Sequence, residues 1–359
     1  MEKIKIINNG IKVAVLYQAF PPPLIDGVRK PMKQGGYADS GADIAYSLKN
    51  QGIETVTPKD QPEVSQDLDW VFPDTHKGIS DALEKGANCL WLNTVTFSRH
   101  PIESFRGKGI YIVGQRPDLV DRFDDKLKTN HLLKENQLPI PDSSIILKGQ
   151  SVDTLTDLVF PVVVKPVRGR GSQGVILVED RIKLNHTIQN HFDSALYGDV
   201  LYIEQYLVGE ELTITIMPPG NYFFGNISVH KPYFWSLPPV RRFNHILGIA
   251  PYNGTVNVVE NSEVITTNEI QSPPLQNLCS AVEKAAELVE AKAPIRIDCR
   301  SDASGLYYLF DLNMKPNMTG PSRPHRHDQN SLTAMAAASI GWNFNLLMLN
   351  MLNQRWRYD

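Results

Sequence analysis

The chain divides into segments that differ in the spacing of their hydrophobic residues, and the first is a near-continuous apolar run at residues 11–19. A run without alternation is typical of a strand that is buried on both faces of a sheet. After a loop rich in proline and glycine, residues 42–52 show the apolar spacing of a helix. Strand and helix candidates then alternate, with strands at 54–57, 69–73, 89–94 and 109–114 and a helix at 76–86. The alternation predicts a parallel α/β domain, which we place at residues 1–116.

Beyond residue 116 the order of predicted helices and strands changes to one that is typical of a small α+β lobe. A charged helical pattern covers residues 117–137 and leads to two strands, 161–167 and 175–179, which flank a glycine-rich loop. A helix and two more strands follow, at 181–196, 200–206 and 211–217. We therefore predict that residues 117–217 hold a bridging helix and a central lobe.

The last part of the chain, residues 218–359, is predicted to form a C-terminal lobe. It contains a helix at 275–292 and a hairpin at 295–313, and residues 329–354 carry no charged side chain at all. A membrane-spanning helix needs about 20 mostly apolar residues, but Asn, Gln and a central Gly341 interrupt this stretch. We therefore predict two helices that pack against the core and meet near Gly341, and no membrane segment.

Composition and charge exclude several classes of protein. The 359 residues are 42% hydrophobic, which excludes disorder along the whole chain. Lysine and arginine number 36 against 39 acidic residues, so we expect neither nucleic acid nor a membrane as a partner. The three cysteines, Cys89, Cys279 and Cys299, are far apart, and the N-terminus lacks a secretory pattern. We therefore expect a cytoplasmic protein with reduced thiols.

The glycine-rich loop, residues 169–174 (GRGSQG), fits the pattern GxGxxG. In a dinucleotide-binding fold a helix follows this loop, whereas here a strand follows. The loop is therefore predicted to join two antiparallel strands and to fold its N–H groups over phosphates. Lys165, on the incoming strand, suits a point charge for a phosphate, and the HRD and DFG triplets of protein kinases are absent. A plain flexible hairpin is the alternative, and this segment alone does not decide between the two.

The predicted hairpin at 295–313 carries polar side chains in an apolar setting. Strand alternation puts Arg296 and Asp298 on one face, and Asp311 and Asn313 on one face. With a turn centred between residues 303 and 304, Arg296 would pair with Asp311, and all four side chains would share a face. Carboxylate and amide oxygens suit Mg²⁺. A solvated face with a salt bridge is the alternative.

These segments occur in an order that resembles a known family. The order is FDDKLKTN with Lys126, VVVKP with Lys165 and its glycine loop, EQYLVGEELT, RID, and DLNMKPNMTGPS. It is similar to the ATP-grasp superfamily, in particular to the D-alanine–D-alanine ligase branch. The resemblance implies a three-lobed ATP-grasp architecture of α/β and α+β parts. It also implies ATP and two Mg²⁺ ions, which Mn²⁺ could replace.

The resemblance also implies roles for individual residues. ATP would be bound by Lys126, Lys165, Gly171, Ser172, Gly174, Glu204, Gln205, Leu207 and Glu211, with residues 204–207 as the adenine hinge. The metal ions would be held by Asp298, Asp311 and Asn313. The predicted catalytic residues are Arg296, Ser172 and Arg242. Arg296 would lie beside the oxyanion of the reacting carboxylate. Arg242 belongs to a segment, 230–252, that corresponds in the family to a loop closing over the γ-phosphate. Ser322 falls where the family binds the carboxylate of the second substrate, and Asn317 stands beside the oxyanion site. This chain's own basic residues add Arg323, in a basic cluster after Ser322, and Lys33 as further predicted substrate ligands.

The sequence also departs from the family's pattern. The family usually has glutamate where Asp311 stands and glycine where Asn317 stands. The N-terminal loop lacks the family's Gly-Gly-x-Ser-x-Glu segment, whose glutamate holds the amine of the first D-alanine. Instead it carries Arg29, Lys30 and Lys33, which indicates a first substrate with a negative group and speaks against D-alanyl-D-alanine synthesis itself.

The leading hypothesis is an ATP-dependent carboxylate–amine ligase that joins small molecules, such as amino acids, through an acyl phosphate and releases ADP and phosphate. Three alternatives stay open: a D-alanine–D-alanine ligase proper, an ATP-grasp enzyme that passes an acyl phosphate to an acceptor other than an amine, and a non-catalytic nucleotide-binding module. The resemblance also implies that a homodimer is possible, but nothing in the sequence itself indicates the oligomeric state.

Overall fold

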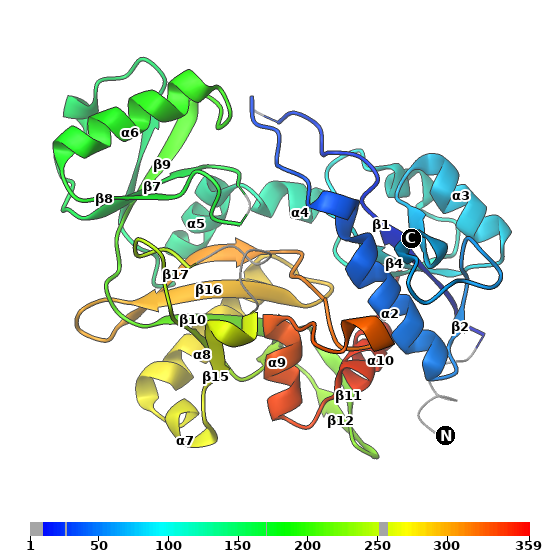
Figure 1. Ribbon diagram of the computed structural model, residues 1–359. Coiled ribbons are helices and arrows are strands. Elements are labelled where there is room, and N and C mark those ends of the chain that lie inside the picture. Colours follow the sequence, from blue (N-terminus) through cyan, green and yellow to red (C-terminus); the bar gives the residue numbers. More distant parts are fainter. Residues whose placement is uncertain (1–9, 26, 170, 251–257) are drawn as a thin grey trace.

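Three lobes surround one cleft in the computed structural model, which describes residues 10–25, 27–169, 171–250 and 258–359 (Figure 1). Parts of three sequence predictions lie outside the described residues: the N-terminus up to residue 9, Arg170 of the glycine loop, and residues 251 and 252. The mixed α/β architecture that the sequence predicts is confirmed, with a parallel sheet in the N-terminal lobe and antiparallel sheets elsewhere.

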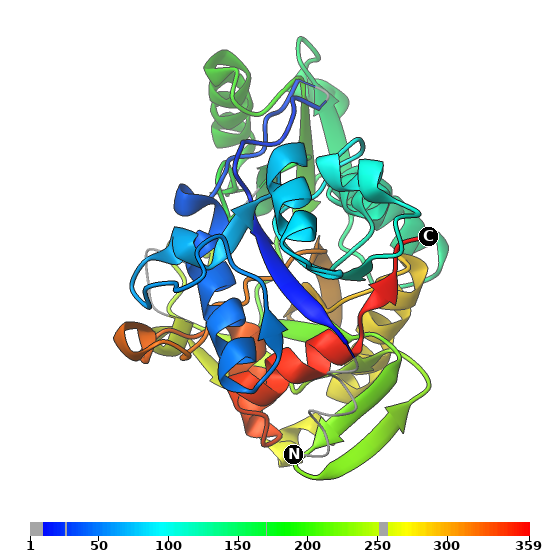
Figure 2. The ribbon, with the colours of Figure 1, turned by 90° about the vertical axis from the view of Figure 1, so that its right-hand side faces the viewer.

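The N-terminal lobe is built on a sheet whose central strand, β1 (Lys12–Tyr17), is buried on both faces, as its apolar run predicts. Its parallel neighbours are β2 (Glu54–Thr55), β3 (Val71–Pro73) and β4 (Cys89–Asn93), and β5 (Tyr111–Val113) follows β4. Helices α2 (Ala38–Asn50) and α3 (His76–Glu84) are also present. The edge is closed by β18 (Trp356–Arg357), which pairs antiparallel with β5 (Figure 2). The sequence pattern did not reveal β18 because two residues carry no periodicity.

The central lobe is a four-stranded antiparallel sheet covered by one helix. Its strand order is β6 (Ser143–Leu147), β9 (Val200–Gln205), β7 (Val162–Pro166) and β8 (Ile176–Val178), and α6 (Arg181–Ser194) packs on it. Two helices lead into this lobe, α4 (Pro117–Phe123) and α5 (Lys126–Glu135). The glycine loop joins the antiparallel strands β7 and β8, as predicted.

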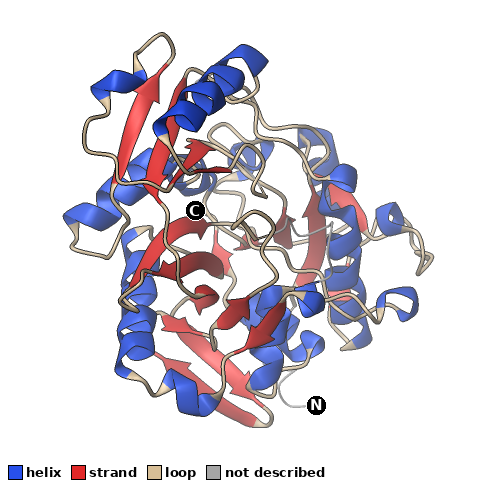
Figure 3. Cartoon of the chain, turned by 60° about the vertical axis from the view of Figure 1, so that its left-hand side comes forward, coloured by secondary structure: helices blue, strands red, loops and turns tan. Residues whose placement is uncertain are grey.

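The C-terminal lobe is a twisted antiparallel sheet, and Figure 3 shows the central lobe above it. Its strand order is β15 (Ser262–Val264), β14 (Val240–Arg242), β10 (Glu211–Met217), β16 (Ile295–Ser301) and β17 (Tyr307–Asn313), with β13 (Trp235–Ser236) also paired to β10. The sequence analysis grouped β10 with the central lobe. In the structure β10 instead pairs with β14 and β16, a choice of partner that local periodicity does not contain.

Helices cover the C-terminal sheet, and one hairpin extends from it. The helices are α7 (Thr267–Ile270), α8 (Pro273–Leu288), α9 (Leu332–Ser339) and α10 (Phe344–Asn353), and the hairpin is β11 (Gly220–Phe224) with β12 (Ile227–Lys231). As predicted, two helices meet near Gly341, with a bend of 98° between α9 and α10. Among the described residues, no single helix combines the length and the apolar composition needed to span a membrane, although this bent pair does so in combination.

A buried ion cluster connects the N-terminal and C-terminal lobes. Arg323 has a completely buried side chain, and its Nε donates to Oδ1 of Asp43 on α2 at 2.9 Å. A second oxygen partner comes from Asp67, whose carboxylate lies 2.7 Å from Nη1. Arg326 donates from Nε to both oxygens of Asp43, at 3.0 Å each. Burial raises the pKa of Asp43, but the two guanidinium groups oppose that effect. The cluster therefore holds the loop before α9 against α2.

Replacing Arg323 tests the contribution of this cluster to stability. Arg323→Met removes one of the two guanidinium partners of the buried Asp43 carboxylate and also the contact with Asp67, and we expect the free energy of unfolding to fall by about 3–5 kcal/mol. Urea denaturation measures this change. The control is Lys77→Met, which removes an exposed pair with Asp81 and should cost less than about 1 kcal/mol. Equal losses in the two variants would show that the cluster does not bind the lobes together.

Candidate active site

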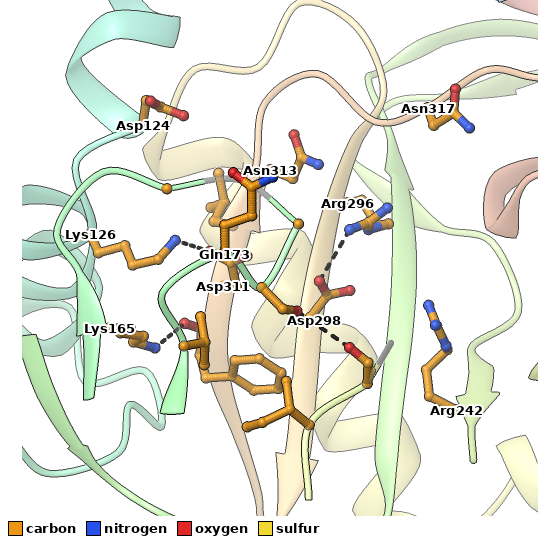
Figure 4. A pocket seen from close by; sticks show the side chains of 18 of the residues that line it. Asp124, Lys126, Lys165, Gln173, Arg242, Arg296, Asp298, Asp311, Asn313 and Asn317 are labelled. Carbon is orange, nitrogen blue, oxygen red and sulfur yellow. Dashed lines mark hydrogen bonds and ion pairs between the residues drawn. The ribbon is translucent and has the colours of Figure 1, made fainter. Parts of the chain in front are cut away.

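A cleft of about 630 Å³ lies where the three lobes meet. The central lobe contributes the glycine loop and strand β7, and the C-terminal lobe contributes the hairpin β16–β17 (Figure 4). The N-terminal lobe contributes the segment before α2. Most of the residues proposed from the sequence line this cleft: Lys33, Lys126, Lys165, Gly171, Ser172, Glu204, Gln205, Leu207, Glu211, Arg242, Arg296, Asp298, Asp311, Asn313 and Asn317. Gly174, Ser322 and Arg323 are absent from the described lining.

The hairpin β16–β17 presents its polar side chains to the cleft, but in a different register from the predicted one. Asp298, not Arg296, lies opposite Asp311, and Arg296 lies opposite Asn313. The prediction of an Arg296–Asp311 pair is therefore wrong. The reason is a β-bulge: Cys299 lies opposite Leu309 while Asp298 lies opposite Asp311, so β17 contains one extra residue at Phe310.

The bulge at Phe310 explains how β17 serves the core and the cleft at once. Leu309 and Leu312 both pack against the core under α8, although they are three residues apart. A regular strand would send them to opposite faces. The extra residue lets both leucines reach the core while Asp311 and Asn313 line the cleft. The carbonyl oxygen of Phe310 accepts a hydrogen bond from Nζ of Lys165 at 3.2 Å.

Two lysines from different elements point into the cleft and are ion-paired there. Lys165 on β7 donates to Oε1 of Glu204 on β9 at 2.7 Å, and both side chains are about 95% buried, with 4% and 5% exposed. Lys126 begins α5 and donates to Oδ1 of Asp311 at 2.5 Å. The helix start is fixed by Asp125, whose carboxylate accepts from two backbone N–H groups of the first turn.

The electrostatic surroundings push the pKa values of two carboxylates in opposite directions. Burial raises the pKa of Glu204 despite its pair with Lys165, and its Oε2 has no hydrogen-bond partner among the described residues. Burial would also raise the pKa of Asp311, but Lys126 and then Lys165 outweigh this effect and hold it at about 2. Asp311 is therefore ionised at neutral pH.

Asp298 and Arg296 form a second charged pair on β16. Nη2 of Arg296 donates to Oδ2 of Asp298 at 3.2 Å, and the hydroxyl of Thr213 on β10 donates to Oδ1 at 2.7 Å. Nε of Arg296 is buried without a partner in the part of the chain that the structure describes. Sequence reasoning missed Thr213, although strand alternation from Glu211 would have placed it on the same face of β10.

Glu211 is held at the edge of the cleft by two basic residues. Its Oε2 lies 2.8 Å from Nε2 of His245 and 3.7 Å from Nη1 of Arg300. Arg300 also donates to the hydroxyl of Tyr206 at 2.9 Å and lies over the ring of that residue. Sequence analysis placed Tyr206 within the adenine hinge but missed Arg300, because the contact between the two side chains joins residues 94 positions apart.

The glycine loop reaches the cleft with a left-handed backbone. Gly171 has φ 58° and Ser172 has φ 60°, and the hydroxyl of Ser172 donates to the carbonyl of Ala250 at 3.3 Å. Gly174 has φ 72°, and a Cβ there would lie 2.6 Å from the ring of Tyr197. Gly174 therefore shapes the loop from behind, whereas Ser172 lines the cleft.

The residues proposed to bind the substrates are split between the cleft and the core. Lys33 lines the cleft and pairs with Asp39 at 2.9 Å, and Asn317 also lines the cleft. Arg323 lies in the ion cluster with Asp43, so the structure brings it to a lobe interface and away from the cleft. The hydroxyl of Ser322 is buried without a partner among the described residues.

Comparison with known proteins gives consistent matches. The family model described as the C-terminal part of D-ala D-ala ligase matches residues 132–353. A D-alanine–D-alanine ligase from Actinobacillus succinogenes is 26% identical over 326 residues, which cover 88% of this chain and 91% of that protein. One from Mannheimia succiniciproducens is 27% identical over 326 residues, which cover 87% and 91%.

Solved structures show the same fold at lower identity. A D-alanine–D-alanine ligase from Bacillus anthracis, complexed with ATP, superposes with a TM-score of 0.63 at 18% identity, over 96% of both chains. The VanG D-Ala:D-Ser ligase from Enterococcus faecalis gives a TM-score of 0.61 at 11% identity, over 95% of this chain and 98% of the other. This chain therefore shares the mixed α/β fold of these proteins.

The low pKa of Asp311 predicts a pH-dependent contribution to stability. Its folded-state pKa of about 2 lies below the unfolded value of about 3.9. The contribution is therefore present above about pH 4 and is lost as the pH falls towards 2. We expect Asp311→Asn to be less stable than the wild type at pH 6, with the difference shrinking at low pH. Chemical denaturation at a series of pH values measures this, and a difference that does not change with pH would contradict it.

Proposed function

The chain belongs to the D-alanine–D-alanine ligase family, and we propose on this basis how it performs the ATP-dependent formation of an amide bond between amino acids. In our proposal, ATP phosphorylates the carboxylate of one substrate, and the amine of the other attacks the resulting acyl phosphate. ADP and phosphate are released. The observation that carries the proposal is the single cleft in which Lys126 and Lys165 lie beside Asp298 and Asp311.

The proposed nucleotide site follows from the polar groups of the cleft. The unpartnered Oε2 of Glu204 suits the exocyclic amine of adenine, and the hinge continues through Gln205 to Leu207. Glu211, at the edge of the cleft, suits the ribose hydroxyls. Lys126 and Lys165 then bind the phosphates, and the glycine loop with Ser172 closes over them. Gly171 and Gly174 serve this loop through their backbone conformations.

The proposed metal site consists of Asp298, Asp311 and Asn313 on one face of the hairpin. Two carboxylates and an amide oxygen are hard ligands that fit Mg²⁺ or Mn²⁺ together with ATP phosphates. Among the described residues there is no group of three or more His, Cys, Asp or Glu side chains that could hold a metal, so ATP would complete the coordination. When bound, two ions would neutralise charge on the phosphates during transfer. Asp311 must first exchange its contact with Lys126.

Arg296 is proposed to stabilise the oxyanion that forms when the amine attacks. Its buried Nε, unpartnered among the described residues, provides a donor that is oriented before the reaction, and such donors stabilise developing charge. Asp298 fixes the guanidinium through Nη2. Asn317 lines the cleft near this end of β16, and we assign it to the substrates.

The substrates differ, in our proposal, from two D-alanines. Lys33 and its partner Asp39 line the N-terminal wall of the cleft, where the family's amine-binding glutamate segment is missing. This wall supports a first substrate that carries an extra negative group. A D-alanine–D-alanine ligase proper is the second candidate, which the names of the relatives at 26% and 27% identity favour. Ser322 stays a proposed substrate ligand, and the homodimer and the cytoplasmic location stay predictions.

A substrate screen tests the ligase proposal. The purified chain is given ATP, Mg²⁺ and pairs of D- and L-amino acids, with acidic amino acids included among the carboxylate donors. We expect ADP release only when both substrates are present, and a product mass equal to the two substrates less one water. Asp311→Ala should lower turnover by about 10²-fold or more, while Asp193→Ala on the exposed face of α6 should not. AMP release, or ADP release independent of an amine, would contradict the proposal.

The pair between Lys126 and Asp311 predicts that a lysine variant binds metal more tightly. Without nucleotide, Lys126 occupies the Asp311 carboxylate, so Mn²⁺ must compete with a charged hydrogen bond. Lys126→Gln should therefore strengthen nucleotide-free Mn²⁺ binding by about tenfold while it weakens ATP binding. Electron paramagnetic resonance of free Mn²⁺ and ATP calorimetry measure the two effects. The control, Lys128→Gln, alters an exposed neighbour that pairs with Asp125, and an equal response in both variants would refute the competition.

A further inference from the structure

A buried histidine connects helix α6 to the glycine loop. His191 lies in the last turn of α6, which covers the sheet of the central lobe (Figure 1), and the residue is 3% exposed. Its Nε2 lies 2.8 Å from the carbonyl oxygen of Gly174, the last residue of the loop. Its Nδ1 lies 2.9 Å from the carbonyl oxygen of Thr187, one turn earlier on the helix. The imidazole ring therefore bridges the helix and the loop.

Both partners of the His191 ring are carbonyl oxygens, which can only accept hydrogen bonds. A neutral imidazole has a single N–H group, so its other nitrogen would turn a lone pair towards a carbonyl oxygen. The doubly protonated imidazolium has an N–H group on each nitrogen, and both contacts are then hydrogen bonds. The geometry therefore fits the imidazolium and neither of the two neutral tautomers.

The surroundings of the ring favour the same protonation state. His191 lies at the C-terminal end of α6 (Arg181–Ser194), where the carbonyl groups of a helix carry partial negative charge and stabilise a cation. The ring of Tyr197 lies against the imidazole, with 4.8 Å between the two centroids, and an aromatic ring at this range also attracts a cation.

Tyr197 is the ionisable group that contacts the His191 ring. Arg170 of the glycine loop lies outside the described residues. The other charged groups on α6, on β7 and in the segments beside them have partners of their own: Lys183 with Glu179, Lys148 with Asp199, Lys165 with Glu204, Asp193 with Gln189, Asp180 with the backbone of Lys183, and Arg181 with the carbonyls of Val152 and Leu155.

The contact with Gly174 fixes the end of the glycine loop. A Cβ at Gly174 would lie 2.6 Å from the ring of Tyr197, so the backbone of Gly174 packs directly on the ring that also contacts His191. The next residue, Val175, donates from its backbone to the carbonyl of Ser172 at 3.1 Å and closes a turn. Ser172 and Gln173 on this turn line the cleft. The carbonyl that His191 contacts thus lies at the base of the turn that reaches the cleft.

We propose that His191 is a positioning residue, which as an imidazolium holds the glycine loop in place over the cleft. The step from the loop to the nucleotide rests on the proposed function, in which this loop binds phosphates. Loss of either ring proton to solvent leaves a lone pair facing a carbonyl oxygen. Thr187 is fixed within the helix, so the contact with Gly174 is the one that yields. Nucleotide affinity should therefore fall as the pH rises through the range in which histidine loses a proton.

Nitrogen NMR of the histidine rings in the ligand-free chain tests the protonation state. Comparison with His191→Gln identifies the signals of His191. Both ring nitrogens should be protonated at about pH 6, and one of them should lose its proton as the pH is raised to about 9. A single protonated nitrogen at the lower pH would overturn the proposal. No nucleotide is needed, so this measurement is independent of the proposed function.

ATP binding by matched variants tests the effect on the loop. His191→Gln keeps an N–H donor for Gly174 but cannot titrate, whereas His186→Gln alters an exposed histidine of the same helix. In calorimetry with saturating Mg²⁺, the wild type should lose about three- to tenfold in ATP affinity relative to His191→Gln between about pH 6 and pH 9. His186→Gln should follow the wild type throughout. The titration of ATP itself is common to all variants and cancels in these ratios.

A third variant separates the hydrogen bond from the packing of the ring. His191→Phe keeps an aromatic ring against Tyr197 but has no donor, so it should bind ATP about three- to tenfold more weakly than the wild type at about pH 6 and equally at about pH 9. A loss that is the same at every pH would show a role in packing alone and would overturn the proposal.

The remaining outcomes separate this inference from the proposed function. Parallel pH profiles for the wild type and His191→Gln, in a chain that binds ATP and forms the amide, would overturn this inference alone. If the wild type does not bind ATP at any pH, the proposed function falls, and the link from His191 to the nucleotide falls with it.

Discussion

Opposite charges held out of water within one cleft are the constraint on which this structure depends. A site for a polyanion and divalent cations needs both lysines and carboxylates, and each would be costly to bury alone. The protein meets this by pairing them before any ligand arrives, Lys165 with Glu204 and Lys126 with Asp311. In the proposed function, ligand binding is an exchange of partners, in which phosphate oxygens would replace the carboxylates at Lys126 and Lys165.

The strand geometry is arranged around these pairs. The bulge at Phe310 allows one face of β17 to pack against the core under α8 while the other face lines the charged cleft. At the bulge, the backbone carbonyl of Phe310 accepts a hydrogen bond from Lys165. β10 contributes to the same site from the next strand through Glu211 and Thr213. Backbone hydrogen bonding therefore fixes the spacing of the charged groups, whereas flexible side chains make only the final contacts.

Much of the fold was predictable from the sequence because its strongest signals are local. The buried run of β1, the amphipathic α3 and the two helices around Gly341 follow from periodicity, and most of the residues that the ordered motifs singled out line the cleft. The register of β16–β17 was not predictable, because strand alternation alone does not reveal the bulge. The bulge is what allows Leu312 to pack against the core while its neighbour Asp311 lines the cleft. The burial of Arg323 was not predictable either, since its carboxylate partner Asp43 comes from a helix 280 residues earlier.

The ion cluster between α2 and the loop before α9 has a consequence for motion. Arg323 and Arg326 on the loop before α9 bind Asp43 on α2, and α10 packs in the same hydrophobic core as α2. We therefore expect the N-terminal and C-terminal lobes to move as one body. The central lobe is connected to this body through the segments beside α5 and β10. We expect opening and closing to have essentially one degree of freedom, the swing of the lobe that carries Lys165 and the glycine loop. In the proposed function, the same movement would then control both substrate entry and the alignment of the phosphates.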